Sequence, residues 1–240
     1  MKISVIIPMY NESRIVADTV RTLDAALLDD FGQGEYEMIF SNDGSTDNTG
    51  EIAMSLAEKY PAMRVVGNDE NFGKGHAVRV GMLAAKGDFV LFTDCDLAYG
   101  TDVIKRFYEE FAKGDADIVV GSRRVDKSGY YGYTLKRKLM SEVYIRVINF
   151  ASGYKGTDSQ CGIKGFSNVC AQRIFSKTTV NRFAFDLEAL LLAKKAKMTI
   201  AEVPVKIINH NDSKVRPIHD SLEMLSCIRK IKKNVKNVQI

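Results

Sequence analysis

The sequence contains few cysteines and histidines and no long apolar run. Four cysteines and three histidines occur in 240 residues. The cysteines form neither a Cys-x-x-Cys pair nor a disulfide framework suited to this length, which predicts a reducing, cytoplasmic environment. No apolar run approaches the ~18 residues of a membrane-spanning helix. The apolar run at the N-terminus is short and is interrupted by Pro8, so we also expect no signal peptide.

Several patterns of catalysis and binding are absent as well. The loop after the first apolar segment lacks the Gly-x-Gly-x-x-Gly of dinucleotide-binding proteins. No Ser-His-Asp order stands out, and His76, His210 and His219 have no mutual ligand spacing. The net charge of +4 is modest, and we predict no nucleic-acid partner. The sequence therefore supports neither a dehydrogenase nor a hydrolase.

Apolar segments of strand and helix character alternate along the chain. We expect strands at 3–7, 37–41, 63–66, from 89, and at 117–120, and helices at 12–28, 45–59 (capped by Ser45 or Thr46), 76–85 and 101–113. This alternation predicts a mostly parallel central sheet flanked by helices, in an α/β domain without repeats or linkers. Further on we expect helices at 130–154, 169–175 and 185–195, and strands late in 157–166, at 199–203 and at 205–208.

Polar loops follow three of the expected strands, at 8–12, 42–47 and 94–99. Carboxyl ends of parallel strands meet at one edge of a sheet, where open α/β sheets bind ligands. Asp94 and Asp96 end a buried strand there, and two carboxylates one residue apart can share a divalent cation already bound to phosphates. The alternative is an ordinary turn and helix cap.

Lys74 lies between two glycines at the expected start of a helix. Glycine lets the backbone approach a ligand closely, and a helix N-terminus favours phosphate. A structural turn explains the glycines but not the lysine. Glu12 and Asp43, at the ends of the first two strands, can accept hydrogen bonds from a base and a ribose, although each is also a common helix cap.

Eight motifs occur in a fixed order: SVIIPMYNE, NDGSTDNT, NFGKGHAVRVGM, DFVLFTDCD, VGSR, DSQCGIKGF, FAFDLE and EVPV. Together they resemble family 2 glycosyltransferases with the A-type fold, and most closely the polyprenyl-phosphate and dolichyl-phosphate glucosyltransferase and mannosyltransferase group. The resemblance runs from about residue 3 to residue 215. It implies a single catalytic domain over 1–215, with a nucleotide-sugar half at 1–121 and an acceptor half at 122–215.

The resemblance implies an inverting transfer of a hexose from a nucleotide sugar to a polyprenyl phosphate, dependent on Mg²⁺ or Mn²⁺. UDP-glucose is the first donor expected, because DSQCGIKGF and FAFDLE favour the glucosyl group, and GDP-mannose is the second. The alternative is a soluble glycosyltransferase that acts on a sugar or protein hydroxyl. The oligomeric state is open.

The positions of this sequence that match the motifs of the family imply roles for individual residues. The resemblance assigns nucleotide-sugar binding to Pro8, Tyr10, Glu12, Asp43, Lys74 and Asp94, metal binding to Asp94 and Asp96, and acceptor binding to Arg123, Arg137, Ser141, Asp158 and Gln160. For Arg137 a solvated helix face is the alternative. Asp186 belongs to the catalytic set with Asp94 and Asp96, either as a base or as a residue that orients the sugar or holds the loop.

The last segment, 216–240, is predicted to be a basic amphipathic helix. Apolar residues recur there at spacings of three or four, with arginine and lysine between them. Such a helix is typical of a membrane-surface or partner-binding element, so we expect peripheral contact with the inner face of the membrane. The alternative is an apolar stripe docked on the sheet, with solvated lysines outside.

Overall fold

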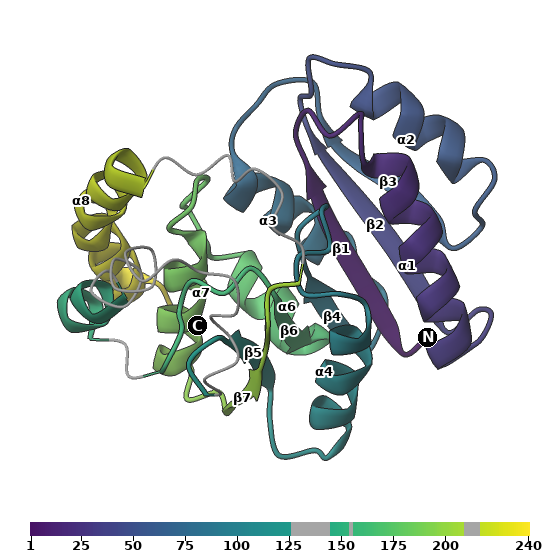
Figure 1. Ribbon diagram of the computed structural model, residues 1–240. Coiled ribbons are helices and arrows are strands. Elements are labelled where there is room, and N and C mark those ends of the chain that lie inside the picture. The colour runs from purple at the N-terminus through teal and green to yellow at the C-terminus, as the bar shows by residue number, and fades with distance from the viewer. Residues whose placement is uncertain (126–144, 154–155, 209–216) are drawn as a thin grey trace.

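The computed structural model describes residues 1–125, 145–153, 156–208 and 217–240, with backbone only for 217–225. A seven-stranded sheet in the order β3-β2-β1-β4-β6-β5-β7 runs through the molecule (Figure 1). The strands are β1 (Ile3–Met9), β2 (Tyr36–Asp43), β3 (Met63–Asn68), β4 (Phe89–Phe92), β5 (Ile118–Ser122), β6 (Lys164–Ser167) and β7 (Ile200–Pro204). Only β6 runs antiparallel to its neighbours, β4 and β5. The predicted α/β fold with a mostly parallel sheet is confirmed.

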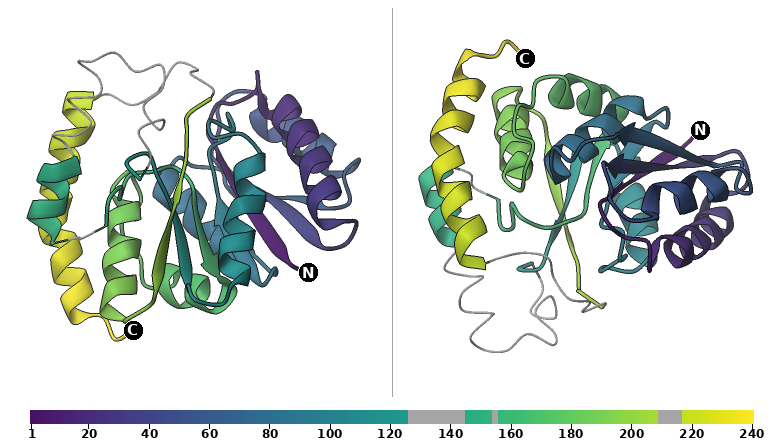
Figure 2. Two further views of the ribbon diagram at one scale, coloured as in Figure 1. Left: turned by 60° about the horizontal axis from the view of Figure 1, so that its bottom comes forward. Right: turned by 90° about the horizontal axis from the view of Figure 1, so that it is seen from above.

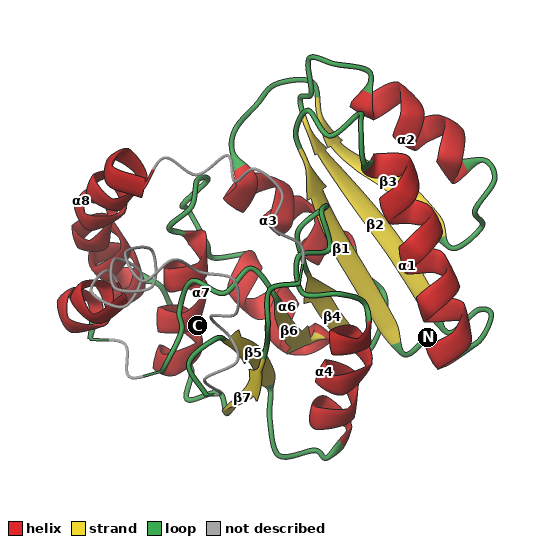
Figure 3. Ribbon diagram, in the orientation of Figure 1, coloured by secondary structure: helices red, strands yellow, loops and turns green. Residues whose placement is uncertain are grey.

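Helices cover both faces of the sheet because the strand residues alternate between two cores. Ile3, Val5 and Ile7 of β1 belong to one cluster, whereas Ile6 belongs to the other. The first cluster packs against α1 (Val16–Phe31), α2 (Thr49–Ala57) and α4 (Asp102–Ala112). The second packs against α3 (Lys74–Ala84), α6 (Asn168–Phe175) and α7 (Phe185–Lys195), and α8 (Pro217–Asn237) lies outside α7 (Figures 2 and 3).

The first two polar loops lie together and are joined by hydrogen bonds. The Asn11 amide nitrogen of the side chain donates to Thr46 Oγ1 at 3.1 Å, and the Asn11 backbone N–H donates to Ser45 Oγ at 3.1 Å. The prediction that Ser45 or Thr46 caps the second helix is therefore wrong, since both hydroxyl oxygens accept hydrogen bonds from Asn11 instead. The helix begins at Thr49, whose backbone N–H is bound by the Asp47 carboxylate at 3.0 Å.

Two further predictions have different outcomes. The expected strand at 205–208 is wrong, because β7 ends where its pairing with β5 ends, at Ser122 and Pro204. The chain then leaves the sheet, and the Ile208 N–H donates to the Ala98 carbonyl oxygen at 2.8 Å. Of the expected helix at 130–154, residues 145–152 are helical and most of the rest lies outside the described residues. No helix in the described ranges is long and apolar enough to cross a membrane.

Candidate active site

Asp94 and Asp96 lie in a tight turn directly after β4. The Leu97 N–H donates to the Asp94 carbonyl oxygen at 3.0 Å, and the Ala98 N–H donates to Asp96 Oδ1 at 3.0 Å. Leu97 has a φ of 48°, a left-handed conformation that is uncommon for leucine and recurs at functional sites. Thr19 of α1 donates its hydroxyl to the Cys95 carbonyl oxygen at 2.6 Å. These hydrogen bonds fix the backbone of the turn, and both carboxylates remain half-buried at the edge of the sheet.

Lys74 is the first residue of α3, and its ammonium group forms an ion pair with Asp94 Oδ1. The glycine that follows lets the helix start come close to α7. A Cβ atom at Gly75 would lie 2.6 Å from the Cβ atom of Phe185. The His76 N–H donates to the Asn181 carbonyl oxygen at 3.0 Å. The N-terminus of α3 is therefore held against the Asp94 turn on one side and the segment before α7 on the other.

Asp43 ends β2 and fixes the loop that leads to Lys74. Its Oδ1 accepts the Phe72 N–H at 3.1 Å, and its Oδ2 accepts the Gly73 N–H at 2.7 Å. Its side chain is only 2% exposed. In this structure Asp43 acts on the site through the position of Lys74, while contact with a nucleotide remains a prediction.

Gly162 gives Asp94 room on its other side. A Cβ atom at this position would lie 2.5 Å from Asp94 Oδ2, closer than real Cβ contacts allow. The Gly162 N–H donates to the Tyr99 hydroxyl oxygen at 3.0 Å, which ties the segment before β6 to the Asp94 turn. Glycine is required here because only a residue without a side chain leaves the carboxylate in place.

Replacing Gly162 with alanine should therefore lower kcat/KM with little loss of stability. The added methyl group must displace the Asp94 carboxylate, and a 1 Å misplacement of a catalytic group can cost about 10²-fold in rate. The φ of Gly162 does not require glycine, so the urea midpoint should change little. Steady-state kinetics and urea unfolding of the same preparation check this. Full activity in a folded variant would show that the Asp94 position is not critical.

Lys164 was not predicted as a site residue. It lies in β6, is 0% exposed, and its ammonium group donates to the Cys161 carbonyl oxygen at 2.6 Å. Its Nζ atom also lies 3.1 Å from Asp186 Oδ1. A lysine is almost never fully buried unless it is paired. The sequence signal was a lysine inside the buried strand segment GIKGF, which contains no acidic residue to pair with it.

Charges of opposite sign alternate from Lys164 to Asp186, Lys74 and Asp94. Burial alone would lower the pKa of Lys74, but Asp94, Asp186 and Asp96 outweigh it and raise that pKa. Burial raises the pKa of Asp186, opposed by Lys164 and Lys74. Burial and the nearby Asp94 raise the pKa of Asp96. The structure thus brings the three predicted catalytic carboxylates and Lys74 into one electrostatic group.

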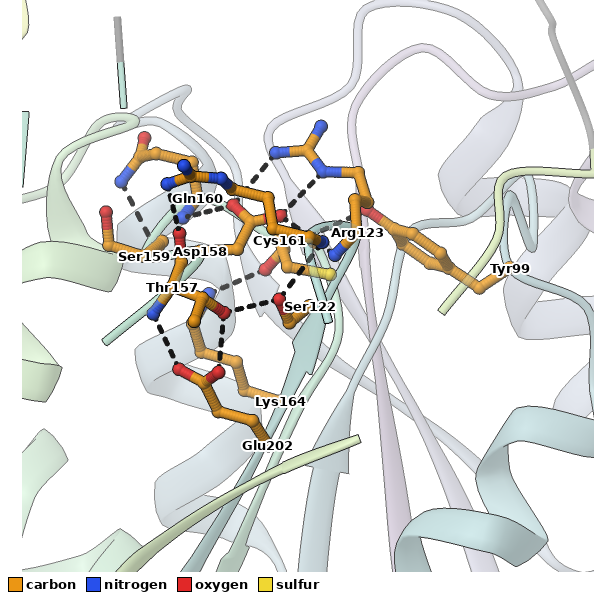
Figure 4. A network of polar contacts seen from close by, with 12 residues as sticks. Tyr99, Ser122, Arg123, Thr157, Asp158, Ser159, Gln160, Cys161, Lys164 and Glu202 are labelled. Carbon is orange, nitrogen blue, oxygen red and sulfur yellow. Dashed lines mark hydrogen bonds and ion pairs between the residues drawn. The ribbon is translucent and has the colours of Figure 1, made fainter. Parts of the chain in front are cut away.

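Arg123 and Asp158, both predicted to bind the acceptor, form a buried bidentate ion pair (Figure 4). Arg123 Nε and Nη2 donate to the two carboxylate oxygens at 2.7 and 2.9 Å. The Asp158 side chain is 0% exposed and that of Arg123 is 13% exposed. Asp158 therefore positions Arg123 rather than facing an open surface. Gln160 is half-buried, and its backbone N–H donates to Asp158 Oδ1 at 3.3 Å.

Three other predicted binding residues, Pro8, Tyr10 and Glu12, lie at the end of β1 and in the first polar loop. Tyr10 is 39% exposed and Pro8 is half-buried. Glu12 is half-buried, and its backbone N–H donates to Thr49 Oγ1 at 2.7 Å. Arg137 and Ser141 lie outside the described residues.

The carboxylate oxygens at the Asp94 turn suit a hard divalent cation whose remaining ligands come from the substrate and from water. Within the described part of the chain, no three His, Cys, Asp or Glu side chains cluster as a complete metal site. Mg²⁺ commonly takes one or two carboxylates and fills its other positions with water and substrate phosphates. Asp94 and Asp96 match that pattern.

The sequence profile described as Glycosyl transferase family 2 matches residues 4–181. The chain belongs to glycosyl transferase family 2. This glycosyltransferase is 33% identical over 244 residues to a dolichyl-phosphate beta-glucosyltransferase of Dictyostelium discoideum, covering 96% of this chain and 73% of the relative. It is also 33% identical over 220 residues to such an enzyme of Trichomonas vaginalis, covering 88% of this chain and 65% of the relative.

Solved structures confirm the A-type fold of this glycosyltransferase. Glucosyl-3-phosphoglycerate synthase of Mycobacterium tuberculosis, solved with Mn²⁺, uridine diphosphate and phosphoglyceric acid, superimposes with a TM-score of 0.70 at 18% identity. The alignment covers 100% of this chain and 80% of that one. At this identity the likeness establishes the fold alone.

Proposed function

We propose that the enzyme transfers glucose from UDP-glucose to a polyprenyl phosphate, with inversion at the anomeric carbon. The observation that carries the proposal is the group formed by Lys74, Asp94 and Asp96 at the carboxyl ends of parallel strands. The identity with dolichyl-phosphate glucosyltransferases supports the acceptor class and the sugar.

In this reaction an oxygen of the acceptor phosphate attacks the anomeric carbon, and the bond from that carbon to the nucleoside diphosphate breaks. The negative charge moves to the leaving diphosphate, where the Lys74 ammonium group stabilises it. A divalent cation bound by Asp94 and Asp96 would neutralise further charge on the diphosphate. Asp158 holds two nitrogens of Arg123, which leaves Nη1 outside the pair to bind the acceptor phosphate.

Asp186 supports a second candidate, transfer to a hydroxyl group. Its Oδ1 is buried and has no hydrogen-bond partner among the described residues, although Lys164 Nζ lies 3.1 Å away. A hydroxyl acceptor needs a base to remove its proton. A lipid monophosphate is already ionised near neutrality, since its second pKa is about 6, and needs none.

Asp186→Asn separates the two candidates. With UDP-glucose, Mn²⁺ and a polyprenyl phosphate, we expect labelled glucosyl lipid from the wild type and less than about a tenfold loss of kcat in the variant. A base would instead account for about 10²–10⁴-fold. The measurement is product formation by mass spectrometry with lipid phosphates and with sugar or peptide hydroxyls in parallel. Transfer only to hydroxyls, abolished in the variant, would overturn the lipid assignment.

A further inference from the structure

The C-terminal helix α8 is fixed to the catalytic domain by its apolar side. Ile228 and Ile231 are 5% and 0% exposed in the core cluster that includes α7. Asn234 Nδ2 donates to Glu188 Oε1 of α7 at 2.7 Å. Lys195, at the end of α7, donates its ammonium group to three carbonyl oxygens near the end of α8, at 2.6 to 2.8 Å. The apolar stripe of α8 thus docks on α7 rather than on the sheet. These contacts fix the orientation of α8, so that its opposite side faces away from α7.

That opposite side is basic. No acidic residue occurs between Ser226 and Ile240. The exposed side chains there include Arg229, Lys230, Lys232, Lys233 and Lys236. Within the ranges that the structure describes, none of these cations takes part in an ion pair. Five exposed positive charges therefore lie along about two turns of α8.

A short helical segment beside α8 carries two exposed apolar side chains. The helical segment 145–152 packs next to α8 in all views of the molecule (Figures 1 and 2). Ile145 and Ile148 are buried, whereas Val147 and Phe150 are 43% and 92% exposed. Valine and phenylalanine three positions apart lie on the same face of a helix. Lys194 of α7 donates to the Gly153 carbonyl oxygen at 3.0 Å, so α7 anchors both helices.

We propose that the cations of α8 together with Val147 and Phe150 form a docking face for an anionic lipid bilayer. Lysine and arginine near an anionic surface attract it, and an apolar side chain beside them can enter the boundary between headgroups and acyl chains. An acidic protein or a nucleic acid could bind through the cations alone, and such a partner would not account for the 92% exposed phenyl ring of Phe150. The inference rests on the proposed function, because a polyprenyl phosphate acceptor would be embedded in a bilayer that the enzyme has to approach.

Vesicle co-sedimentation of the full chain tests the docking face. The wild type should bind vesicles of phosphatidylcholine with phosphatidylglycerol, should bind phosphatidylcholine alone weakly, and should dissociate as salt is raised. The double variant Lys230→Gln, Lys233→Gln should lower the partition coefficient about 30-fold, at roughly a fivefold loss for each charge. Phe150→Ser should lower it about tenfold, because the phenyl ring that would be buried in the bilayer is lost.

Matched controls lie on α2 and in the turn that follows it, at the other end of the sheet. Met54 is 58% exposed and Lys59 is exposed, so Met54→Ser and Lys59→Gln change the same residue classes on a remote surface. Equal loss of binding in these controls, or no loss in the α8 and Phe150 variants, would overturn the proposal. So would a wild-type dimer that Phe150→Ser dissociates, because the phenyl ring would then contact a second copy.

The docking face and the proposed reaction can fail separately. Vesicle binding is measured without donor or acceptor, and glucosyl transfer is measured with a short polyprenyl phosphate in detergent. The docking variants should keep wild-type rates in detergent and lose activity only when the acceptor is embedded in anionic vesicles. Absence of transfer in detergent with intact vesicle binding would contradict the reaction and leave the docking face standing.

Discussion

Replacing Asp94 with asparagine should lower kcat by about 10³-fold, equivalent to about 4 kcal/mol of transition-state stabilisation. The carboxylate has two functions in the proposed site. It is one of two oxygen donors for a divalent cation, and it holds the Lys74 ammonium group at the start of α3. Asparagine keeps the shape but removes the charge that serves both. Steady-state kinetics with UDP-glucose and titrated Mn²⁺ measure the effect.

The dependence on Mn²⁺ separates these functions from general damage. In Asp94→Asn the Mn²⁺ concentration for half-maximal rate should rise, whereas Asp18→Asn, an exposed carboxylate on α1, should behave as wild type. Unchanged kcat and unchanged Mn²⁺ dependence in a folded Asp94→Asn protein would refute the assignment of Asp94 to the metal.

Replacing Arg123 with methionine should lower the free energy of unfolding by about 3–5 kcal/mol, because the buried carboxylate of Asp158 then loses the guanidinium group that neutralises its charge. The double variant Arg123→Met, Asp158→Leu should recover most of that loss, since no unpaired charge remains. Arg123→Lys should fall between, because an ammonium group cannot form the bidentate pair. Urea unfolding of the wild type, Arg123→Met, Asp158→Leu and the double variant forms a double-mutant cycle. A loss of stability equal to the sum of two independent effects would show that the pair is not coupled.

The same ion pair predicts how stability depends on pH. Burial would raise the pKa of Asp158, but the Arg123 guanidinium outweighs it and lowers that pKa below its unfolded value. A carboxyl group with a lowered folded-state pKa contributes its full stabilisation above the unfolded pKa of about 4, and loses it as pH falls below that value. In Arg123→Met, Asp158→Leu this acid-sensitive part of the stability should disappear.

The succession of strands and helices along the chain and the position of the polar loops after strands could be predicted from the sequence, because their signals are local. Alternating apolar residues and turn residues such as Asn42 and Gly44 act over a few positions. Partners of charged residues could not be predicted in this way. Lys164 and Asp186 are far apart in the chain and meet only through the packing of β6 against α7. Asp43 and Asp158 were predicted to bind substrate, and in the structure their carboxylates hold neighbouring protein groups.

The order of the sheet has a consequence for how the chain folds. β4, which carries the Asp94 turn, and β5, the next strand in the sequence, are not neighbours, because β6 lies between them and pairs with both. Until residues 164–167 leave the ribosome, β4 therefore keeps one open edge, and β5 has no link to the N-terminal strands. Open strand edges pair with other chains, and long-range pairings form slowly. The nascent enzyme therefore passes through a stage at which β4 has been synthesised but still has an open edge that can pair with other chains.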